Sequence, residues 1–450
     1  MTGVLQRFVN IREEEVGPVL ASMLFYFCVL SALMVIRPAR ESLGMEQGLD
    51  TVRWLFMGTA IVTLLVNPVF GWLVSRFRRI VFINATYIFF ATSLVGFYFA
   101  LVFAPDAIGN ISGRIFYVWF SVFNLFVNMV FWGLMADRFS LEQSKRLFGA
   151  IAAGGTVGAI VGPLLAGQLA EPFGTPFLLL AGVGFLIAAT GAAALVSRTQ
   201  PGSVKATATA TAGETDKESV EERQVIGGSP LNGLKTAVST PYFLGISVYV
   251  LIAAIFATYL YFTQLQIVAG MAEGVDQQTT IFANVNLYTQ IATLILQLLV
   301  AGHIMRWVGV PIALVLLPVT TALGFLGLAV TASFATIVLA QAAYNSVQRA
   351  IMRPARETLF TVVNREDKYK AKAFIDTFVY RGGDVLGSQT EGWLGRLGMG
   401  LTALISVAVP LALVWGVLGL WLGKAQQRKA RAVNGGVETL DPTAAASPAR

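Results

Sequence analysis

Hydrophobic residues dominate this chain in long runs that are separated by short polar connections. A helix needs about 20 apolar residues to cross a bilayer, and each run comes close to that length. The pattern therefore predicts an all-α integral membrane protein with twelve transmembrane helices. We expect them at 16–40, 54–74, 80–103, 115–136, 147–169, 177–197, 242–266, 279–301, 308–331, 334–356, 373–393 and 399–422.

The segments at 147–169 and 373–393 are the least hydrophobic of the twelve. The first of them, "FGAIAAGGTVGAIVGPLLAG", places Gly154, Gly158 and Gly162 at four-residue spacing on one helical face. Small residues in this pattern let two membrane helices approach closely. We interpret the glycines as a packing face rather than as ligand contacts.

Charge is scarce and unevenly placed. Only 13% of residues are charged and 56% are hydrophobic, whereas soluble domains carry about a quarter charged residues. Most of the 32 Lys and Arg residues lie in the amino terminus, the even-numbered loops and the tail. The positive-inside rule then predicts cytoplasmic termini. The net charge of +7 is a topology signal, and we expect no nucleic-acid partner.

A polar, low-complexity interruption divides the apolar segments into two sets of six. Residues 198–241 include "SVKATATATAGETDKESVEER", whose composition predicts a disordered cytoplasmic linker. We expect an N-terminal half at 1–197, a C-terminal half at 242–423 and a disordered cytoplasmic tail at 424–450. This layout resembles the major facilitator superfamily, in which two six-helix halves surround a central site.

Two short loops strengthen that resemblance. "GWLVSRFRR", which contains Arg76, is similar to the basic loop between helices 2 and 3 of that superfamily, and "GLMADRFS", with Asp137 and Arg138, has a similar character after helix 4. The resemblance implies that these residues act as cytoplasmic hinges and latches. The alternative is that the loops are basic only because they face the cytoplasm.

The string Arg-Pro-Ala-Arg-Glu occurs twice, at the ends of the first and tenth predicted helices. The first arginine of each copy has a glutamate four residues later on its own helical face. These pairs are Arg37 with Glu41 and Arg353 with Glu357. The second arginines, Arg40 and Arg356, have no partner at that spacing, and Arg349, Arg353 and Arg356 would form one row on a continuous α-helix.

Arginines without counter-charges inside a membrane usually face a water-filled path or a ligand. Guanidinium groups bind phosphate and carboxylate oxygens in a bidentate fashion. Helices 1 and 10 are also symmetry-related positions in inverted repeats that surround a midplane site. The motif therefore predicts an anion-binding role, although arginines at helix ends can also extend to lipid headgroups.

Further polar residues lie within apolar segments. Arg381 and Asp384 are three residues apart in helix 11, which predicts a structural ion pair, with a proton relay as the alternative. Asn124 on helix 4 and Gln266 on helix 7 offer uncharged polar contacts. Such side chains can join helices or line a substrate site, and the sequence leaves both readings open.

The helix 1 motif, "FYVWFSVFNLFVNMVFWGLMADRFSLEQSKRLFG" and "NREDKYKAKAFIDTFVYRGGDVLG" together resemble the ATP/ADP translocases, most closely their relatives in free-living bacteria. The resemblance implies nucleotide exchange across a bacterial cytoplasmic membrane. It also places the family's basic residues of helices 1 and 10 on or near Arg40 and Arg356. The family's acidic positions fall near Phe120 and Gln266, neither of which is acidic.

We therefore expect a secondary active transporter of an organic, phosphorylated anion, such as a nucleotide, that works by alternating access of two halves. The chain contains no "GxxxxGK[ST]" motif that would couple it to ATP hydrolysis. One histidine and scattered acids argue against an enzyme, and we expect no cofactor, metal or obligate protein partner. The alternatives are a transporter of lipids or lipid headgroups and a scaffold or sensor that has lost transport.

Overall fold

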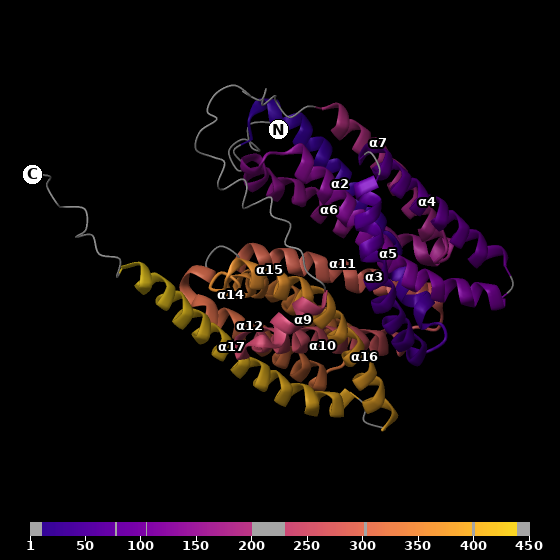
Figure 1. The fold of residues 1–450 in the computed structure, drawn as a ribbon. Helices are drawn as coiled ribbons and strands as arrows, with labels where there is room; N and C mark the ends of the chain where they lie inside the picture. Colours follow the sequence, from indigo (N-terminus) through magenta and orange to yellow (C-terminus); the bar gives the residue numbers. More distant parts are fainter. Residues whose placement is uncertain are drawn as a thin grey trace, which may run out of the picture. The chain divides into compact units, whose positions relative to one another are not determined.

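The computed structural model describes residues 11–76, 79–104, 106–199, 230–300, 304–397 and 401–438. All regular elements in these ranges are helices (Figure 1). Ten of the described helices are long and apolar enough to cross a membrane. The prediction of an all-helical, multi-pass membrane protein is confirmed, and ten of the twelve predicted segments correspond to these helices.

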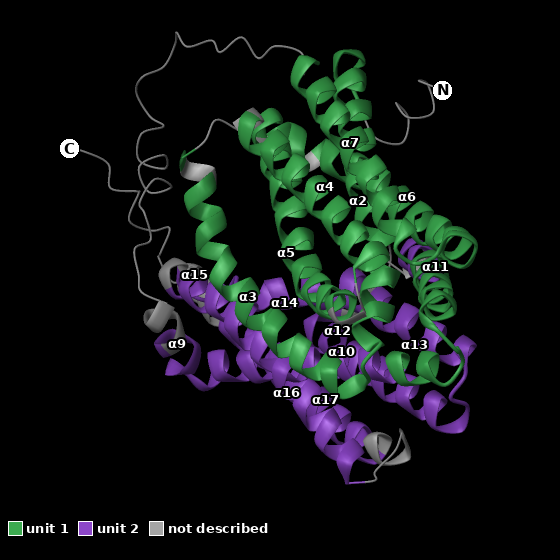
Figure 2. Cartoon of the chain, turned by 90° about the vertical axis from the view of Figure 1, so that its right-hand side faces the viewer, with its two compact units in different colours: residues 1–223, 264–291 green, residues 224–263, 292–450 purple. Residues whose placement is uncertain are grey.

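The chain forms two compact units (Figure 2). The first unit comprises residues 1–223 and 264–291, and the second comprises 224–263 and 292–450. The first unit thus includes part of the segment 242–423 that we predicted as the C-terminal half. Most of the predicted linker, residues 200–229, lies outside the described residues.

The first unit is built around one long central helix. Its elements are η1 (Glu13–Glu15), α2 (Val16–Met45), α3 (Leu49–Arg76), α4 (Arg79–Phe103), α5 (Asp106–Arg138), α6 (Leu141–Phe173) and α7 (Phe177–Arg198), with the adjoining ends of α10 (Pro241–Ala269) and α11 (Val275–Val300). Helix α2 packs against α5, α6 and α7. Its buried Phe25 contacts the rings of Tyr87 and Phe131, so aromatic side chains fill much of this core.

The glycines of α6 lie directly against the backbone of α2. A Cβ atom at Gly158 would stand 2.4 Å from the carbonyl oxygen of Phe27, and one at Gly154 would stand 2.4 Å from that of Met23. A Cβ at Gly162 would meet the Cβ of Met34 at 2.7 Å. The predicted glycine packing face is therefore confirmed.

The second unit contains more interruptions. Its elements are α9 (Pro230–Ser239), parts of α10 and α11, α12 (Ile304–Val330), α13 (Phe334–Val347), η2 (Gln348–Met352), α14 (Arg353–Leu359), α15 (Arg365–Phe374), η3 (Ile375–Val379), α16 (Tyr380–Arg396) and α17 (Leu401–Glu438). Helix α12 packs along α17. The buried Trp415 of α17 stacks on Phe256 and contacts Tyr249, both from α10.

Two π-helical turns explain why ten and not twelve described helices meet the criteria for a membrane span. Turn η2 separates α13 from α14 inside the predicted segment 334–356, and η3 separates α15 from α16 inside 373–393. A π-turn widens the helix and changes the direction of the side chains that follow it. The motif arginines of the second copy lie beside η2.

Helix α17 extends further than predicted. The apolar pattern ends at 422, and we predicted disorder from 424, but the helix continues to Glu438 (Figure 1, yellow). The stretch "KAQQRKARA" consists of strong helix formers, which favour continuation of a helix once it has begun. Residues 439–450 lie outside the described residues.

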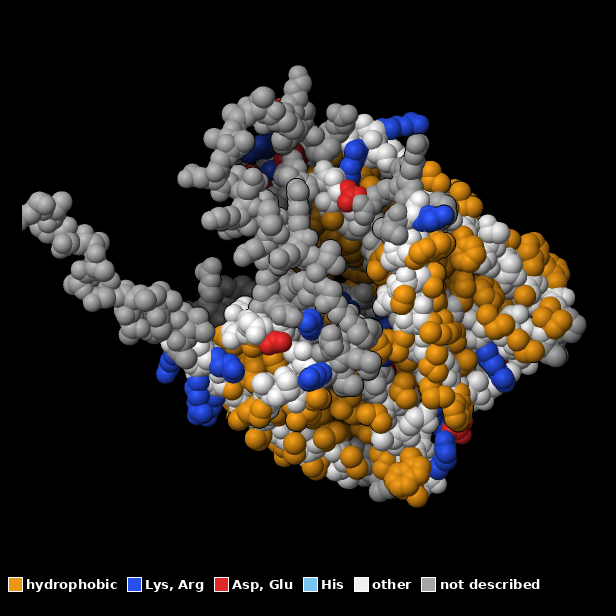
Figure 3. All heavy atoms as spheres, viewed as in Figure 1, with side chains coloured by type: hydrophobic (Ala, Val, Ile, Leu, Met, Phe, Trp, Pro, Cys, Tyr) orange, Lys and Arg blue, Asp and Glu red, His pale blue; other side chains and the backbone are white. Residues whose placement is uncertain are grey.

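Large hydrophobic side chains cover much of the described surface (Figure 3). Val330 is 83% exposed, Leu298 is 75% exposed and Leu65 is 67% exposed. Water-soluble monomers rarely expose large contiguous apolar areas, whereas a bilayer solvates them. Cys28, the only cysteine of the chain, is buried in α2.

Candidate functional site: two arginine–carboxylate clusters

The arginine at the fourth position of the first motif copy is held in the interior of the first unit. Arg40 is 9% exposed, and its Nη1 donates to Oε1 of Glu41 at 2.8 Å. Its Nε donates to the carbonyl oxygen of Tyr117 at 3.3 Å, and its guanidinium carbon lies 3.7 Å above the Tyr117 ring. The Phe120 ring is 5.5 Å away. A carboxylate on one side and aromatic faces on the other therefore stabilise the cation.

This geometry adds a second partner to the pairing predicted for the motif. The expected pair of Arg37 with Glu41 is present, with Nε of Arg37 4.0 Å from Oε1 of Glu41, but Nη1 of Arg40 lies closer to the same oxygen, at 2.8 Å. The Arg37 side chain is 41% exposed, whereas that of Glu41 is 4% exposed. Glu41 turns toward the adjacent Arg40 because both side chains are buried, where a close pair offsets the cost of desolvation.

In the second copy, within the second unit, the second arginine of the motif is paired as well. Nη2 of Arg356 lies 3.6 Å from Oε1 of Glu357 and 3.1 Å from Oδ1 of Asp376 in η3. Glu357 also accepts a hydrogen bond from Nζ of Lys372 in α15. The Arg356 side chain is 15% exposed, and its Nε is buried without a hydrogen-bond partner. The expected pairing of Arg353 with Glu357 is therefore replaced by pairing of Arg356.

Glu357 follows the predicted segment 334–356 and carries a shifted pKa. Burial raises the pKa of this carboxyl, but the hydrogen bond and charge of Lys372 and the charge of Arg356 lower it more. The net shift is downward from the ordinary value of 4.5. The carboxylate is thus a charged member of the cluster at neutral pH.

The predicted arginine row of helix 10 is not carried by one regular helix. Arg349 lies inside η2, while Arg353 and Arg356 lie in α14. Arg349 and Arg353 are exposed, and Arg356 is largely buried. The π-turn breaks the i, i+4, i+7 spacing that the sequence suggested, because that spacing assumes a continuous α-helix.

The Arg381–Asp384 pair of α16 forms as predicted. Nη1 of Arg381 donates to Oδ2 of Asp384 at 3.0 Å, and Asp384 is 8% exposed. The neighbouring Gly383 and Gly387 let α16 approach α10 closely: a Cβ at Gly383 would stand 2.6 Å from that of Ala254. The pair therefore lies at a tight helix–helix contact of the second unit.

The remaining predicted residues lie on other helices of the described chain. Asn124 is exposed on α5 and accepts a hydrogen bond from Asn128 at 2.9 Å, and Gln266 is half-buried on α10. Arg76 and Asp137 are exposed at the ends of α3 and α5.

Arg138 caps another helix of the first unit. Its Nη2 donates to the carbonyl oxygens of Ser197 and Thr199 at 2.8 and 2.9 Å, and also to that of Val196. The last carbonyls of a helix have no intrahelical partners, and a cation there also interacts favourably with the helix dipole. This contact ties the end of α5 to the end of α7.

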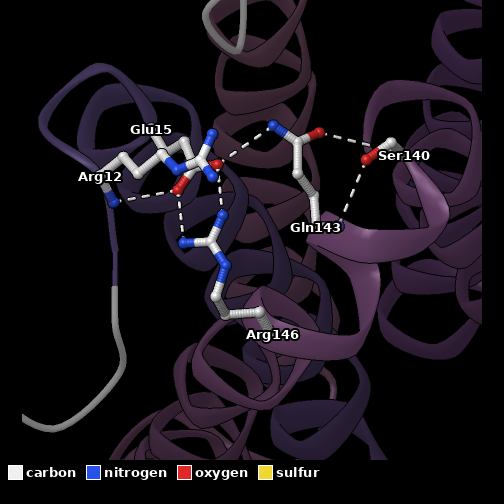
Figure 4. Close-up of polar contacts among 5 residues, drawn as sticks. All are labelled: Arg12, Glu15, Ser140, Gln143 and Arg146. Carbon is white, nitrogen blue, oxygen red and sulfur yellow. Dashed lines mark hydrogen bonds and ion pairs between the residues drawn. The ribbon is translucent and has the colours of Figure 1, made fainter.

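A further ion pair of the first unit escaped the sequence analysis (Figure 4). Glu15, which is 2% exposed, binds Arg146 of α6 in a bidentate manner, with distances of 2.7 and 2.6 Å. Gln143 donates to the same carboxylate at 3.1 Å and also forms a capping box with Ser140. The Ser-x-x-Gln spacing was the available signal, but nothing in the sequence pairs Glu15 with α6.

A buried hydroxyl cluster was missed for the same reason. The hydroxyl of Thr279 on α11 lies within hydrogen-bond distance of the hydroxyls of Ser42 on α2 and Thr175 between α6 and α7. Asp276 accepts a hydrogen bond from the backbone N–H of Thr175 at 2.6 Å. All four residues belong to the first unit, so these contacts attach the start of α11 to it.

Residues 19–352 match the model of the Major Facilitator Superfamily, and this match covers most of the chain. The chain belongs to this superfamily. The comparison with curated protein sequences found no match to this facilitator.

Solved transporter structures share its fold. A bacterial homologue of the human lysosomal transporter Spinster, inward-facing and unoccupied, is 13% identical, with a TM-score of 0.59 over 93% of this chain and 99% of the other. The POT family transporter PepTSo is 13% identical, with a TM-score of 0.61 over 91% and 98%. A POT family transporter in complex with 5-aminolevulinic acid is 10% identical, with a TM-score of 0.61 over 90% and 96%. The facilitator therefore has a transporter fold.

Proposed function

We propose that this facilitator is a secondary active transporter of an organic anion that carries phosphate or carboxylate groups, and that it works by alternating access. Arg40 and Arg356 are proposed to contact the anion, each from its own unit. The observation that carries the proposal is the repeated geometry: in both copies of the motif the second arginine is buried and pairs with the adjacent glutamate.

The electrostatics of each cluster favour an exchangeable anion. A guanidinium within a membrane protein is stable only with a compensating partner. Glu41, Glu357 and Asp376 supply that compensation, and a phosphate or carboxylate of a substrate can bind a guanidinium with two parallel hydrogen bonds. An anionic substrate can therefore displace an internal carboxylate at small net cost. Removal of the anion restores the internal pair.

Nucleotide exchange is the specific case that we propose first, because both motif arginines are present. In the resembled ATP/ADP translocases an acidic residue falls near Phe120, and here the Phe120 ring lies 5.5 Å from the Arg40 guanidinium. An aromatic face attracts the cation without competing for it as strongly as a carboxylate would. This replacement leaves Arg40 better able to bind a substrate anion. We further propose a bacterial cytoplasmic membrane as the location, with both termini inside and no catalytic activity.

The experiment is a melting-temperature assay on purified protein with ATP, ADP, glucose 6-phosphate, glycerol 3-phosphate and citrate. A ligand that binds only the folded state adds about 2.7 kcal/mol of apparent stability at roughly a hundredfold excess over its Kd. We expect at least one of these anions to raise the melting temperature. We expect Arg40→Ala and Arg356→Ala to lose that rise.

A matched control separates ligand binding from general loss of charge. Arg53→Ala removes a buried arginine that pairs with Asp50 at 2.6 Å outside the motif, and it should retain the ligand-induced rise. Exchange of labelled nucleotide in proteoliposomes then tests transport directly. The proposal fails if no anion stabilises the wild-type protein, or if the two motif variants respond as the wild type does.

A further inference from the structure

An apolar groove opens on the side of the first unit, and its described lining contains none of the arginines or carboxylates of the two clusters. It has a volume of about 390 Å³ and lies among α3, α4 and α5. Its walls include Leu73, Ala85, Phe89, Phe90 and Phe126, and among the described lining residues only Thr86 has a polar side chain. The volume falls within the range of small-molecule sites, but the lining offers almost no hydrogen bonds. Its occupant should therefore be a hydrocarbon.

The groove is accessible from the outer surface of the unit. Phe89 is 63% exposed and Val81 is 54% exposed, although both line it. In a bilayer such a surface is in contact with lipid chains, and an unfilled groove there would forfeit dispersion contacts along its walls. Val81, Ala85 and Phe89 follow one another at four-residue spacing along α4, so the groove runs along this helix.

One end of the groove coincides with a basic helix connection. Leu73 lines the groove, and Arg76, which is exposed, lies one turn further along α3. Trp72, four residues before Arg76, is 58% exposed, and exposed tryptophans are typical of the headgroup level of a membrane. The stretch 71–90 contains three arginines and no acidic residue.

We propose that this groove is a binding site for an anionic phospholipid of the leaflet that meets the α3–α4 connection, which the charge pattern predicts to be cytoplasmic. One acyl chain occupies the groove beside α4, and the phosphate lies at Arg76. Basic residues at the cytoplasmic ends of membrane helices attract anionic headgroups. The apolar lining and the positive charge of this stretch together select a lipid with a negative headgroup over a neutral one.

Native mass spectrometry of the full chain with phosphatidylglycerol or phosphatidylcholine of the same acyl chains tests the site. We expect the first phosphatidylglycerol to bind more tightly than the first phosphatidylcholine. Ala85→Phe places a ring in the groove from an exposed position. It should lower the affinity for the first bound phosphatidylglycerol about tenfold. Arg76→Gln should weaken the binding of phosphatidylglycerol more than that of phosphatidylcholine and so reduce the preference for the anionic headgroup.

Two control variants make the outcome decisive. Ala188→Phe adds the same ring at an exposed position of α7 that does not line the groove, and Arg198→Gln removes an exposed arginine at the end of the same helix. Both should bind lipid as the wild type does, and the lipid-free melting temperature of each variant checks its fold. Equal phosphatidylglycerol affinity in the wild type and Ala85→Phe would overturn the acyl-chain site. An unchanged headgroup preference in Arg76→Gln would overturn the role of Arg76.

Discussion

The Nη2 atom of Arg356 lies 3.1 Å from Oδ1 of Asp376, so the motif arginine of the second unit pairs with an acid that lies beyond the end of its own helix. Asp376 belongs to the π-turn η3, and Arg356 lies shortly after the π-turn η2. One π-turn therefore contains the acid of this ion pair, and the other precedes the helix that carries the arginine. π-Turns occur frequently at functional sites because they redirect side chains.

The first prediction follows from this pair. If the substrate anion competes with Asp376 for Arg356, Asp376→Asn should strengthen anion binding. A partly exposed ion pair is worth up to about 1 kcal/mol, which corresponds to roughly fivefold in affinity. Isothermal titration of the anion identified by the melting assay measures the change. Asp376→Glu keeps the charge and should leave the affinity near the wild-type value; weaker binding in Asp376→Asn would contradict the competition.

The second prediction concerns the contact between η1 and α6. Glu15→Gln removes the carboxylate that binds Arg146 in a bidentate manner. Loss of one partner of a largely buried pair typically costs about 3 kcal/mol, because the other charge is left in a poorly solvated place. We therefore expect a clearly lower melting temperature. Glu14→Gln, at the exposed neighbouring position, is the control and should have little effect.

A double-mutant cycle tests whether that loss belongs to the pair. Adding Arg146→Gln to Glu15→Gln should cost less than the sum of the two single changes, because each single variant already breaks the same contact. Strict additivity of the two effects would show that Glu15 and Arg146 stabilise the protein independently of each other.

The third prediction is a pH dependence. The folded-state pKa of Glu357 is lowered from 4.5, so the unfolded chain binds a proton more readily at this group. The stability that Glu357 contributes is therefore present above about pH 4.5 and is lost as the pH falls through the lower folded-state pKa. The melting temperature of the wild type should fall more steeply below pH 4.5 than that of Glu357→Gln.

Lys372→Gln provides the matched variant for this measurement. It removes one hydrogen bond and one of the two charges that lower the pKa of Glu357. Its melting temperature should therefore depend less on pH below 4.5 than that of the wild type. A curve parallel to the wild type would assign the pH dependence to other carboxylates.

The fourth prediction tests the contact between α2 and α6. Gly158→Ala puts a Cβ 2.4 Å from the carbonyl oxygen of Phe27, a backbone atom that cannot move aside easily. We expect a loss of about 2 kcal/mol or more, as is typical of overpacking. Gly149→Ala is made on the same helix, where a Cβ has no neighbour within 4 Å, and should be neutral or stabilising by up to about 1 kcal/mol. Chemical denaturation in detergent compares the two.

The sequence predicts most of the helices and one of the close contacts because those features depend on local patterns. Hydrophobic runs mark the spans, and the spacing of Gly154, Gly158 and Gly162 marks a face that packs against α2. The interruptions in 334–356 and 373–393 are not predictable in this way, since a π-turn preserves the hydrophobic composition and changes only the register.

At the candidate site, too, local patterns predict some features and tertiary packing decides the others. The repeated motif identifies Arg40 and Arg356 as the arginines of interest, but the rule of four-residue spacing does not predict that each of them pairs with the glutamate next to it. Spacing alone carries no information on burial, and burial decides which guanidinium the glutamate approaches. Asp376 cannot be predicted as the partner of Arg356, because their proximity depends on how two separate helices pack.

The single cysteine of this facilitator makes it unusually accessible to site-directed labelling. Cys28 is 4% exposed within α2, and a thiol in such surroundings reacts slowly with labelling reagents. Pairs of new cysteines at exposed helix ends can thus carry spin labels or fluorophores on the otherwise natural sequence. Distances between such labels, recorded with and without an anion, would follow the motion of one unit against the other in a bilayer.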